Sequence, residues 1–251
     1  MLVVGGDPEK NLDNAVQFIR DAAAEGCDVI VLPECLDFGW TNSLARKGAV
    51  SIPGAYSDRL TGAAGDHKIF VAAGLTERDG DHIFNTALLL SPEGEILAKH
   101  RKINILDIAR DLYTPGSQLQ VTPTELGRIG LNICADNSPN AKALGHALGF
   151  MGADIILSPC AWAVPPDHDN DKEPYGEMWI NAYTDIANTY HIPVIGVSNT
   201  GTIADGPWKN WNCIGSSLVV SREGMVQKQY DYTATGQKLY VIDVALRLKD
   251  R

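Results

Sequence analysis

The sequence has no apolar run long enough to cross a membrane. A spanning helix needs roughly 20 consecutive apolar residues, and polar or charged residues interrupt every apolar stretch of this chain well before that length. The start of the chain also lacks the basic residues followed by an apolar segment that mark a secretion signal. We therefore expect no membrane partner.

Basic residues are scarce as well. The chain has 21 Lys and Arg against 31 Asp and Glu, so its formal net charge is −10 and its isoelectric point is about 5.0. A surface that binds phosphates needs a basic patch. We therefore expect neither nucleic acid nor an anionic membrane as a partner.

Cysteines are few, and their number is odd. Five cysteines without regular spacing, in a chain without a secretion signal, predict free thiols in a reducing cytoplasm. Four of them, Cys27, Cys35, Cys160 and Cys213, are expected to pack in the core. The fifth cysteine, Cys134, has a different setting.

No linker rich in Ser, Gly or Pro divides the chain, so residues 1–251 are predicted to form one domain. Apolar periodicity predicts helices and strands in alternation, with two hairpins. This mixture predicts an α/β fold with mixed sheets. The predicted helices are 11–25, 141–151 and 175–190, and the predicted strands are 28–32, 69–75, 83–90, 95–102, 215–220 and 225–230.

The stretch 127–139 leads from an apolar strand through Cys134 to the start of a predicted helix. Backbone N–H groups at a helix start favour a thiolate, which makes Cys134 a candidate nucleophile. A lone cysteine in such a place is more often a small core residue. Ser138 and Pro139 predict the N-cap and the first turn of the following helix.

Two other strands end in charged residues. The apolar strand 29–32 stops at Pro33 and presents Glu34, and α/β proteins place catalytic groups at such strand ends. A later strand runs into the basic cluster that contains Lys99, Arg101 and Lys102. Such a cluster is usually a solvated surface, so Lys102 alone predicts no activity.

Together these three segments resemble the nitrilase superfamily of carbon–nitrogen hydrolases, whose catalytic Glu, Lys and Cys follow in this order. The matching signatures are Leu32-Pro33-Glu34, Arg101-Lys102-Ile103 and the stretch 130–136, and residues 152–162 and 178–199 extend the resemblance. The resemblance implies a single-domain α-β-β-α sandwich with two mixed β-sheets. It also implies a homodimer or a larger homo-oligomer, with no cofactor and no metal.

The resemblance assigns roles to individual residues. Cys134 would attack a carbonyl carbon and form a thioester, and Glu34 would carry protons as general base and acid. Lys102 and the backbone N–H of Ala135 would stabilise the oxyanion. Asp136 is expected to support the loop around the nucleophile. The implied activity is hydrolysis of a small amide or N-carbamoyl compound, with release of ammonia or an amine, and Ala135 favours these substrates over nitriles.

The sequence departs from the family in two places. Many members hold the lysine with a second Glu, but residues 104–116 contain none. Asp111 or Asp107 is the candidate replacement beside Lys102, although an aspartate in such a loop more often forms a turn or a cap. The family's first strand is short or missing in residues 1–7.

Other features concern substrate binding. Tyr113, Trp162 and Trp179 are candidates for the wall of the substrate pocket. The acidic loop 165–173 lacks the spacing and the glycine of an EF-hand, so we expect it to face substrate or solvent without a metal. Its charge favours a cationic substrate.

Several alternatives stay open at this point. The same three residues could hydrolyse a nitrile, or the chain could be a catalytically silent relative that binds a small molecule. A third possibility is a glutaminase that supplies ammonia to a partner enzyme. His146, one helix after Cys134, suggests a Cys–His pair as in thiol proteases, although its mid-helix position points away from the strand end.

Overall fold

The computed structural model describes residues 1–246, and its helices form where apolar residues repeat at helical spacing. The first helix, α1 (Pro8–Ala24), begins at Asp7, whose side chain accepts the N–H of Lys10 at 3.2 Å. Gly26, with φ of 77°, follows its end. The other helices are α2 (Ala45–Gly48), α3 (Ala55–His67), α4 (Ala143–Phe150), α5 (Glu177–Tyr190) and the short 3₁₀ helices η1 (Asp107–Ala109) and η2 (Cys134–Asn137).

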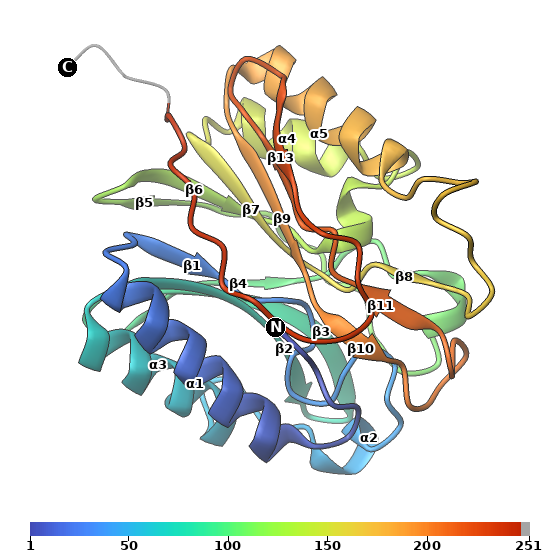
Figure 1. Ribbon diagram of the computed structural model, residues 1–251. Helices are drawn as coiled ribbons and strands as arrows, with labels where there is room; N and C mark the ends of the chain where they lie inside the picture. The colour runs from blue at the N-terminus through green and yellow to red at the C-terminus, as the bar shows by residue number, and fades with distance from the viewer. Residues whose placement is uncertain (247–251) are drawn as a thin grey trace.

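The first sheet has the strand order β1-β2-β3-β4. β1 pairs with β2 in parallel, and the other pairs are antiparallel, so the sheet is mixed. β3 and β4 form the first predicted hairpin. The helices α1 and α3 cover its outer face (Figure 1). The strands are β1 (Val29–Val31), β2 (Phe70–Asp79), β3 (His82–Leu90) and β4 (Ile96–Arg101).

The second sheet has the order β13-β12-β9-β7-β6-β5 and is also mixed, because β6, β7 and β9 run parallel while the outer pairs are antiparallel. The helices α4 and α5 lie on its outer face (Figure 1). β12 and β13 form the second predicted hairpin. The strands are β5 (Val121–Thr124), β6 (Gly127–Leu131), β7 (Ile155–Cys160), β9 (Val194–Ser198), β12 (Leu218–Val220) and β13 (Val226–Gln229).

The two sheets stack face to face and share one apolar core. Ala72 and Leu89 of the first sheet belong to the same buried cluster as Leu131, Ile156 and Leu157 of the second. Each fully buried Leu or Ile side chain contributes about 1.5–3 kcal/mol to folding. The predicted α/β fold with two mixed sheets between helix layers is confirmed.

Sequence reasoning missed two features of this architecture. A small sheet of β8 (Ala163–Val164), β11 (Asn212–Ile214) and β10 (Thr200–Thr202) lies at one end of the sandwich. Ser138 does not begin the helix that follows Cys134, because α4 starts only at Ala143. Instead, Ser138 ends η2 and its hydroxyl donates to the carbonyl of Ala135 at 2.7 Å, so the N-cap prediction is wrong.

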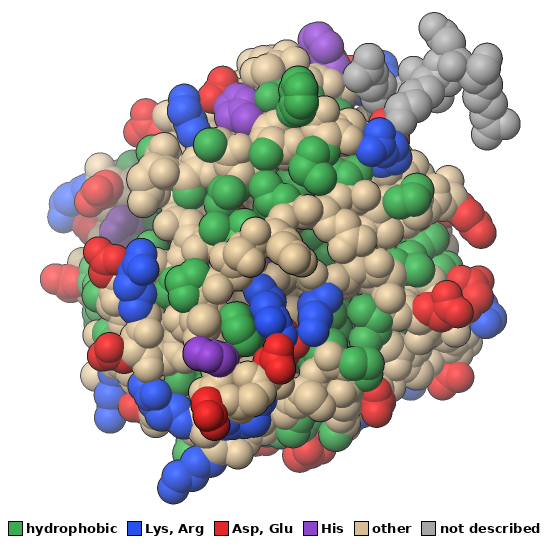
Figure 2. All heavy atoms as spheres, turned by 180° about the vertical axis from the view of Figure 1, so that it is seen from behind, with side chains coloured by type: hydrophobic (Ala, Val, Ile, Leu, Met, Phe, Trp, Pro, Cys, Tyr) green, Lys and Arg blue, Asp and Glu red, His purple; other side chains and the backbone are tan. Residues whose placement is uncertain are grey.

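The surface carries both charges. Seen from behind, acidic and basic side chains mix around the edge of the molecule, with apolar side chains between them (Figure 2). No helix within residues 1–246 is long and apolar enough to cross a membrane. Before α1, Leu2 forms only an isolated parallel bridge with Thr200.

Candidate active site

Glu34 lies just beyond the end of β1, where the apolar strand stops at Pro33. Its side chain is 1% exposed, and its Oε1 accepts one hydrogen bond from Asn85 and one from Lys102, each at 2.6 Å. Its other oxygen, Oε2, has no hydrogen-bond partner among the described residues. One oxygen therefore fixes the side chain, and the other is free to handle a proton.

A glycine in β2 makes room for this turn. A Cβ at Gly74 would lie 2.6 Å from the Cα of Glu34 and 2.8 Å from the carbonyl oxygen of Pro33. Both are backbone atoms, which cannot move aside as a flexible side chain would. Any larger residue at this position would displace Glu34.

Lys102 follows the last residue of β4 and is 3% exposed. Its backbone N–H donates to Asn85 at 2.8 Å, and its carbonyl accepts from Gly116 at 2.8 Å. Burial alone would lower the pKa of Lys102, but the negative charge of Glu34 and its hydrogen bond to the amine raise it above the ordinary value. The amine therefore stays protonated beside Glu34.

Cys134 opens η2 with φ of 43°, a value that non-glycine residues rarely adopt. Its N–H donates to the Ser158 hydroxyl at 3.2 Å. The hydrogen bond to Cys160, burial and the charge of Glu34 raise the pKa of the Cys134 thiol well above its ordinary value, against an opposite effect of Lys102. The expected stabilisation of a thiolate by a helix start is therefore wrong for the resting protein, whose thiol needs a base.

Asp136 joins the nucleophile turn to the lysine loop. Its carboxylate accepts N–H groups from Ile133, Ile103 and Asn104 at 3.0, 3.1 and 2.8 Å, and it pairs with the ring of His100 at 2.8 Å. Burial would raise the pKa of Asp136, but the bond and charge of His100 and the Asn104 N–H lower it below its ordinary value. Asp136 thus connects the two loops as an ionised side chain.

Ala135 supplies a backbone N–H beside the nucleophile. As the second residue of η2, it lies in the first turn, where N–H groups have no partner within a helix. Its carbonyl is held by Asn104 Nδ2 at 2.7 Å and by Ser138. These bonds hold the peptide between Ala135 and Asp136, while the Ala135 N–H belongs to the preceding peptide, at the start of the turn.

Two of the three predicted aromatic residues lie in the cluster that contains Cys134. Trp162 and Trp179 stack with ring centroids 5.2 Å apart, and both belong to the same buried apolar cluster as Cys134. The Nε1 of Trp179 donates to the hydroxyl of Tyr175 at 2.8 Å. Burial raises the pKa of Tyr175, against the lowering effect of its hydrogen bond with Trp179.

Tyr113, the third predicted wall residue, belongs to a different apolar cluster. Its hydroxyl accepts the N–H of Thr41 at 3.0 Å and contacts the Cys35 sulfur at 3.5 Å. These contacts anchor the loop after Glu34. They give Tyr113 a structural place in the core rather than one beside Cys134.

Neither predicted aspartate replaces the second Glu. Asp111 is exposed, and Arg46 bonds to its backbone carbonyl rather than to its carboxylate. Asp107 is exposed and pairs with Arg110 at 2.8 Å. The prediction that Asp111 holds Lys102 is wrong, because η1 buries Ala109 and turns both carboxylates toward solvent.

His146 does not pair with Cys134. Its ring lies in α4, bonds to Asp185 of α5 at 3.2 Å and contacts the Tyr190 ring at a centroid distance of 5.6 Å. α4 and α5 cover the outer face of the second sheet (Figure 1). The alternative of a Cys–His pair is therefore wrong.

The acidic loop 165–173 lies beside Tyr175, whose ring contacts that of Trp162. Asn170 Oδ1 accepts the N–H of Tyr175 at 2.9 Å, while Asp169 pairs with Lys172 at 2.7 Å. Within residues 1–246, no group of three or more His, Cys, Asp or Glu side chains is arranged to hold a metal ion. The loop can therefore influence substrate near Tyr175 through charge.

Sequence reasoning missed the groups that hold Glu34, Cys134 and Asp136. Asn85 holds Glu34, Ser158 holds the Cys134 N–H, and His100 holds Asp136. A polar residue within a strand that is otherwise apolar is the signal that could have found Asn85. The candidate site itself is closed, because Glu34, Lys102 and Cys134 are at most 8% exposed.

This arrangement can perform acyl transfer. It combines a thiol, a carboxylate with one free oxygen, a fixed cation and a backbone N–H at a turn. Comparison with known proteins agrees: the family described as carbon-nitrogen hydrolase matches residues 4–250. The chain belongs to this family, which is part of the nitrilase superfamily.

Curated relatives include enzymes of two kinds. The omega-amidase NIT2 of Homo sapiens is 32% identical over 162 residues, which cover 61% of this chain and 58% of that protein. A nitrilase of Pyrococcus abyssi is 32% identical over 165 residues, covering 63% of this chain and 62% of its own. The matched part of the chain thus spans little more than half the length of these relatives.

Solved structures share the fold. A carbon-nitrogen hydrolase from Helicobacter pylori G27 has a TM-score of 0.80 at 20% identity, covering 92% of this chain and 84% of its own. An amidase from Nesterenkonia sp. AN1, described with acrylamide added to its active-site cysteine, has a TM-score of 0.78 at 22% identity, covering 92% and 87%. These similarities show that this chain has the same fold as the two solved structures.

Proposed function

We propose that this protein hydrolyses the C–N bond of a small amide or N-carbamoyl compound through a thioester on Cys134. The observation that carries the proposal is the buried Glu34–Lys102 pair at 2.6 Å, whose carboxylate keeps one oxygen free beside the nucleophile turn. The omega-amidase and the amidase among the similar proteins support an amide substrate. The similar nitrilase keeps nitrile hydrolysis as the second candidate.

The first chemical step is a proton transfer. Because burial and Glu34 hold the Cys134 thiol neutral, the nucleophile forms only when a base removes its proton. Glu34 serves as that base through its free Oε2. The sulfur then attacks the carbonyl carbon of the substrate.

The tetrahedral intermediate carries a negative oxygen. The Lys102 ammonium and the Ala135 N–H would stabilise it, because both are fixed in place before the reaction begins. Protonated Glu34 then passes its proton to the departing nitrogen, and ammonia or an amine leaves. Water activated by Glu34 cleaves the thioester and restores the thiol.

The closed site favours a small substrate. The three candidates are almost completely buried, and Trp162 and Trp179 stack within the same apolar cluster as Cys134. As part of the same proposal, the acidic loop 165–173 favours a substrate with an amine. We further propose that the protein is cytoplasmic and forms a homodimer or a larger homo-oligomer.

The test is ammonia release from a panel of primary amides, N-carbamoyl amines, N-carbamoyl amino acids and nitriles. Wild-type protein is compared with Cys134→Ala and with Cys27→Ala, a half-buried thiol that is not one of the three catalytic candidates. We expect release from an amide or carbamoyl compound, a loss of more than about 10³-fold in Cys134→Ala, and normal rates in Cys27→Ala.

Equal release by Cys134→Ala would contradict the thiol mechanism. Release from nitriles alone would contradict the substrate class while keeping the mechanism. A correctly folded protein that acts on no panel member would favour the silent, binding relative.

A further inference from the structure

Two thiols meet where neighbouring strands of the second sheet end. β6 and β7 pair in parallel, with Leu131 opposite Leu157. Cys134 lies three residues beyond Leu131, and Cys160, the last residue of β7, lies three residues beyond Leu157. Since neighbouring strands are about 4.8 Å apart, this equal offset places the two cysteines at the same level of the sheet.

One hydroxyl group, that of Ser158, contacts both cysteines. It accepts the main-chain N–H of Cys134 at 3.2 Å, and the Cys160 thiol donates to it at 3.7 Å. The two thiols also share a hydrogen bond, which raises the pKa of the Cys134 thiol more than any other contact does. The candidate nucleophile therefore has a second thiol as its immediate neighbour.

Cys160 is also tied to the residue that would act as the base. Its carbonyl accepts the N–H of Glu34 at 3.2 Å, and its sulfur contacts the Tyr183 hydroxyl at 3.7 Å. The hydrolysis proposed above has no step for this thiol. A buried cysteine packs as a small apolar side chain, so the property that sets Cys160 apart from an alanine is its redox chemistry.

The position of the two cysteines suits a disulfide. A disulfide joins residues whose Cα atoms are about 4.4–6.8 Å apart. The spacing of neighbouring strands lies within this range, so closing the bond would leave the pairing of β6 and β7 in place. The Cys134 backbone and the Cys160 side chain are already held at one point by Ser158.

We propose that Cys134 and Cys160 form a reversible disulfide when hydrogen peroxide enters the site. Glu34 first takes the Cys134 proton through its free oxygen. The sulfur then attacks one peroxide oxygen, the O–O bond breaks, and the departing hydroxide takes the proton back and leaves as water. Sulfur is oxidised to a sulfenic acid, and the peroxide is reduced.

The second step closes the disulfide. The Cys160 sulfur attacks the sulfur of the sulfenic acid, the S–S bond forms as the S–O bond breaks, and the hydroxide leaves as a second water with the Cys160 proton. The disulfide blocks the nucleophile but protects it from irreversible oxidation, and a thiol reductant restores both cysteines. The inference uses the thiol and base of the proposed hydrolysis, but disulfide formation needs no substrate, so the two can fail separately.

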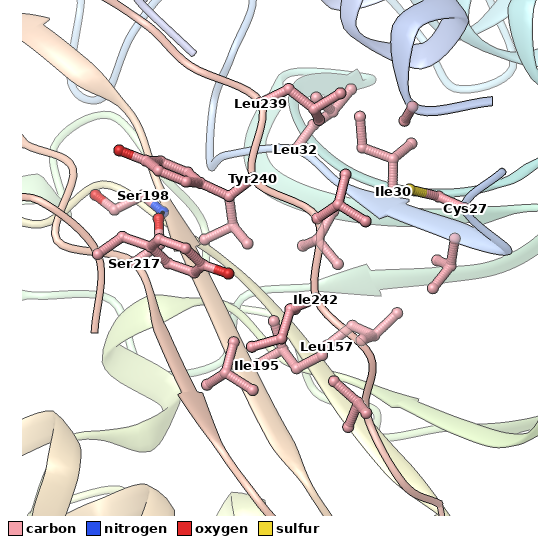
Figure 3. A pocket seen from close by; sticks show the side chains of 18 of the residues that line it. Cys27, Ile30, Leu32, Leu157, Ile195, Ser198, Ser217, Leu239, Tyr240 and Ile242 are labelled. Atoms are coloured by element: carbon pink, nitrogen blue, oxygen red, sulfur yellow. Dashed lines mark hydrogen bonds between the residues drawn. The ribbon is translucent and has the colours of Figure 1, made fainter. Parts of the chain in front are cut away.

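Cys27 provides the control, because it is the most open thiol and lies in different surroundings. It is half-buried, whereas the other four cysteines are buried. It lines a cavity of about 1090 Å³, and Figure 3 shows it with Ile30 and Leu157 around this space. No other cysteine of residues 1–246 lines that cavity, so exposure to peroxide alone gives Cys27 no thiol partner there.

The test treats wild-type protein, Cys160→Ser and Cys27→Ala with hydrogen peroxide in the absence of substrate. Circular dichroism first checks that each variant is folded. The remaining thiols are alkylated in denaturant, and masses are determined intact and after trypsin digestion, with and without a reductant. Trypsin cleaves after Lys142, so Cys134 and Cys160 lie on separate peptides that only a disulfide can join.

We expect wild type and Cys27→Ala to lose two thiols and to give the joined peptides, with at least about nine-tenths of Cys134 recovered by the reductant. Cys160→Ser should give no joined peptides and a sulfinic or sulfonic acid on Cys134, with less than about one-tenth recovered.

Three results would overturn the inference. These are joined peptides of another cysteine pair in wild type, oxidation of wild type without any joined peptides, and full recovery of Cys134 in folded Cys160→Ser. If Cys160→Ser fails to fold, the peptide maps of wild type and Cys27→Ala still decide the matter.

Discussion

The carboxyl end of β1 and its free edge border regions of opposite character. Beyond its carboxyl end, Glu34 is 1% exposed and two donors at 2.6 Å fix its Oε1. Along its free edge, Val29 and Val31 border a cavity of about 1090 Å³. The closed region is held by polar contacts between loops distant in sequence, whereas the open region lacks a neighbouring strand. The polar contacts around Glu34 are therefore made even though the free edge of β1 borders a cavity.

The largest expected effect concerns the closed end. Glu34→Gln keeps an acceptor for Asn85 and Lys102 but cannot carry a proton, so we expect turnover to fall about 10²- to 10⁴-fold. Steady-state rates on the best panel substrate measure this effect. Glu93→Gln, at an exposed turn residue, is the control. Normal turnover by Glu34→Gln would remove Glu34 from the chemistry.

A pair of core variants compares a covered and an open face of the second sheet. Ile195 pairs with Leu157, so Ile156 lies on the opposite face; Ile156 is 0% exposed, and Ile195 is half-buried beside the cavity. We expect Ile156→Ala to lower the free energy of unfolding by about 2–5 kcal/mol. Ile195→Ala should cost roughly half as much, because less area leaves water on folding. Urea unfolding measures the free energy of unfolding of both variants. Equal decreases would mean that the cavity beside Ile195 is closed in solution.

Asp136→Asn tests the connector between the two catalytic loops. The substitution should lower the free energy of unfolding at pH 7 by about 1–3 kcal/mol, because a charged acceptor of several buried N–H groups is lost. The pKa of Asp136 is lowered in the folded protein, so its contribution is complete above the unfolded value of about 3.9 and declines as the pH falls below it.

The difference between wild type and Asp136→Asn should therefore shrink between pH 7 and pH 3. Unfolding by urea at the two pH values measures the change. A difference that is the same at both values would show that the Asp136 charge does not stabilise the turn.

The smallest expected effect is that of His146→Ala. Its ring contacts Asp185 and Tyr190 on the outer side of the sandwich, so turnover should stay within about twofold of wild type. The turnover of His146→Ala is measured in the same assay as that of wild type and Glu34→Gln. A loss as large as that of Cys134→Ala would return the Cys–His pair to consideration.

The order of motifs in the sequence predicts Glu34, Lys102 and Cys134 as the central residues. Glu34 and Lys102 each follow a strand, and Cys134 lies three residues beyond the end of β6. Their contacts required the tertiary structure. The partner of Lys102 turned out to be Glu34 itself, whereas Asp111 faces solvent because η1 directs it outward.

The failure at Ser138 has a local cause that the sequence does not show. A Ser-Pro pair is a good helix start, but the Asp136 carboxylate binds the Ile133 N–H and closes a 3₁₀ turn before the helix. At Ser138 a buried polar contact therefore decided the outcome over local preference. Thr41 and Cys35 hold the hydroxyl of Tyr113, whose place in the pocket wall stays a prediction.

The most direct test of the central claim is to trap the acyl group on Cys134. Wild-type protein turning over its best amide or carbamoyl substrate is quenched in acid, and its mass is determined intact and after digestion. The account predicts an acyl adduct on the peptide that contains Cys134, its release by hydroxylamine as a hydroxamate, and its absence in Cys134→Ala. Turnover without any adduct, continuing in Cys134→Ala, would contradict it.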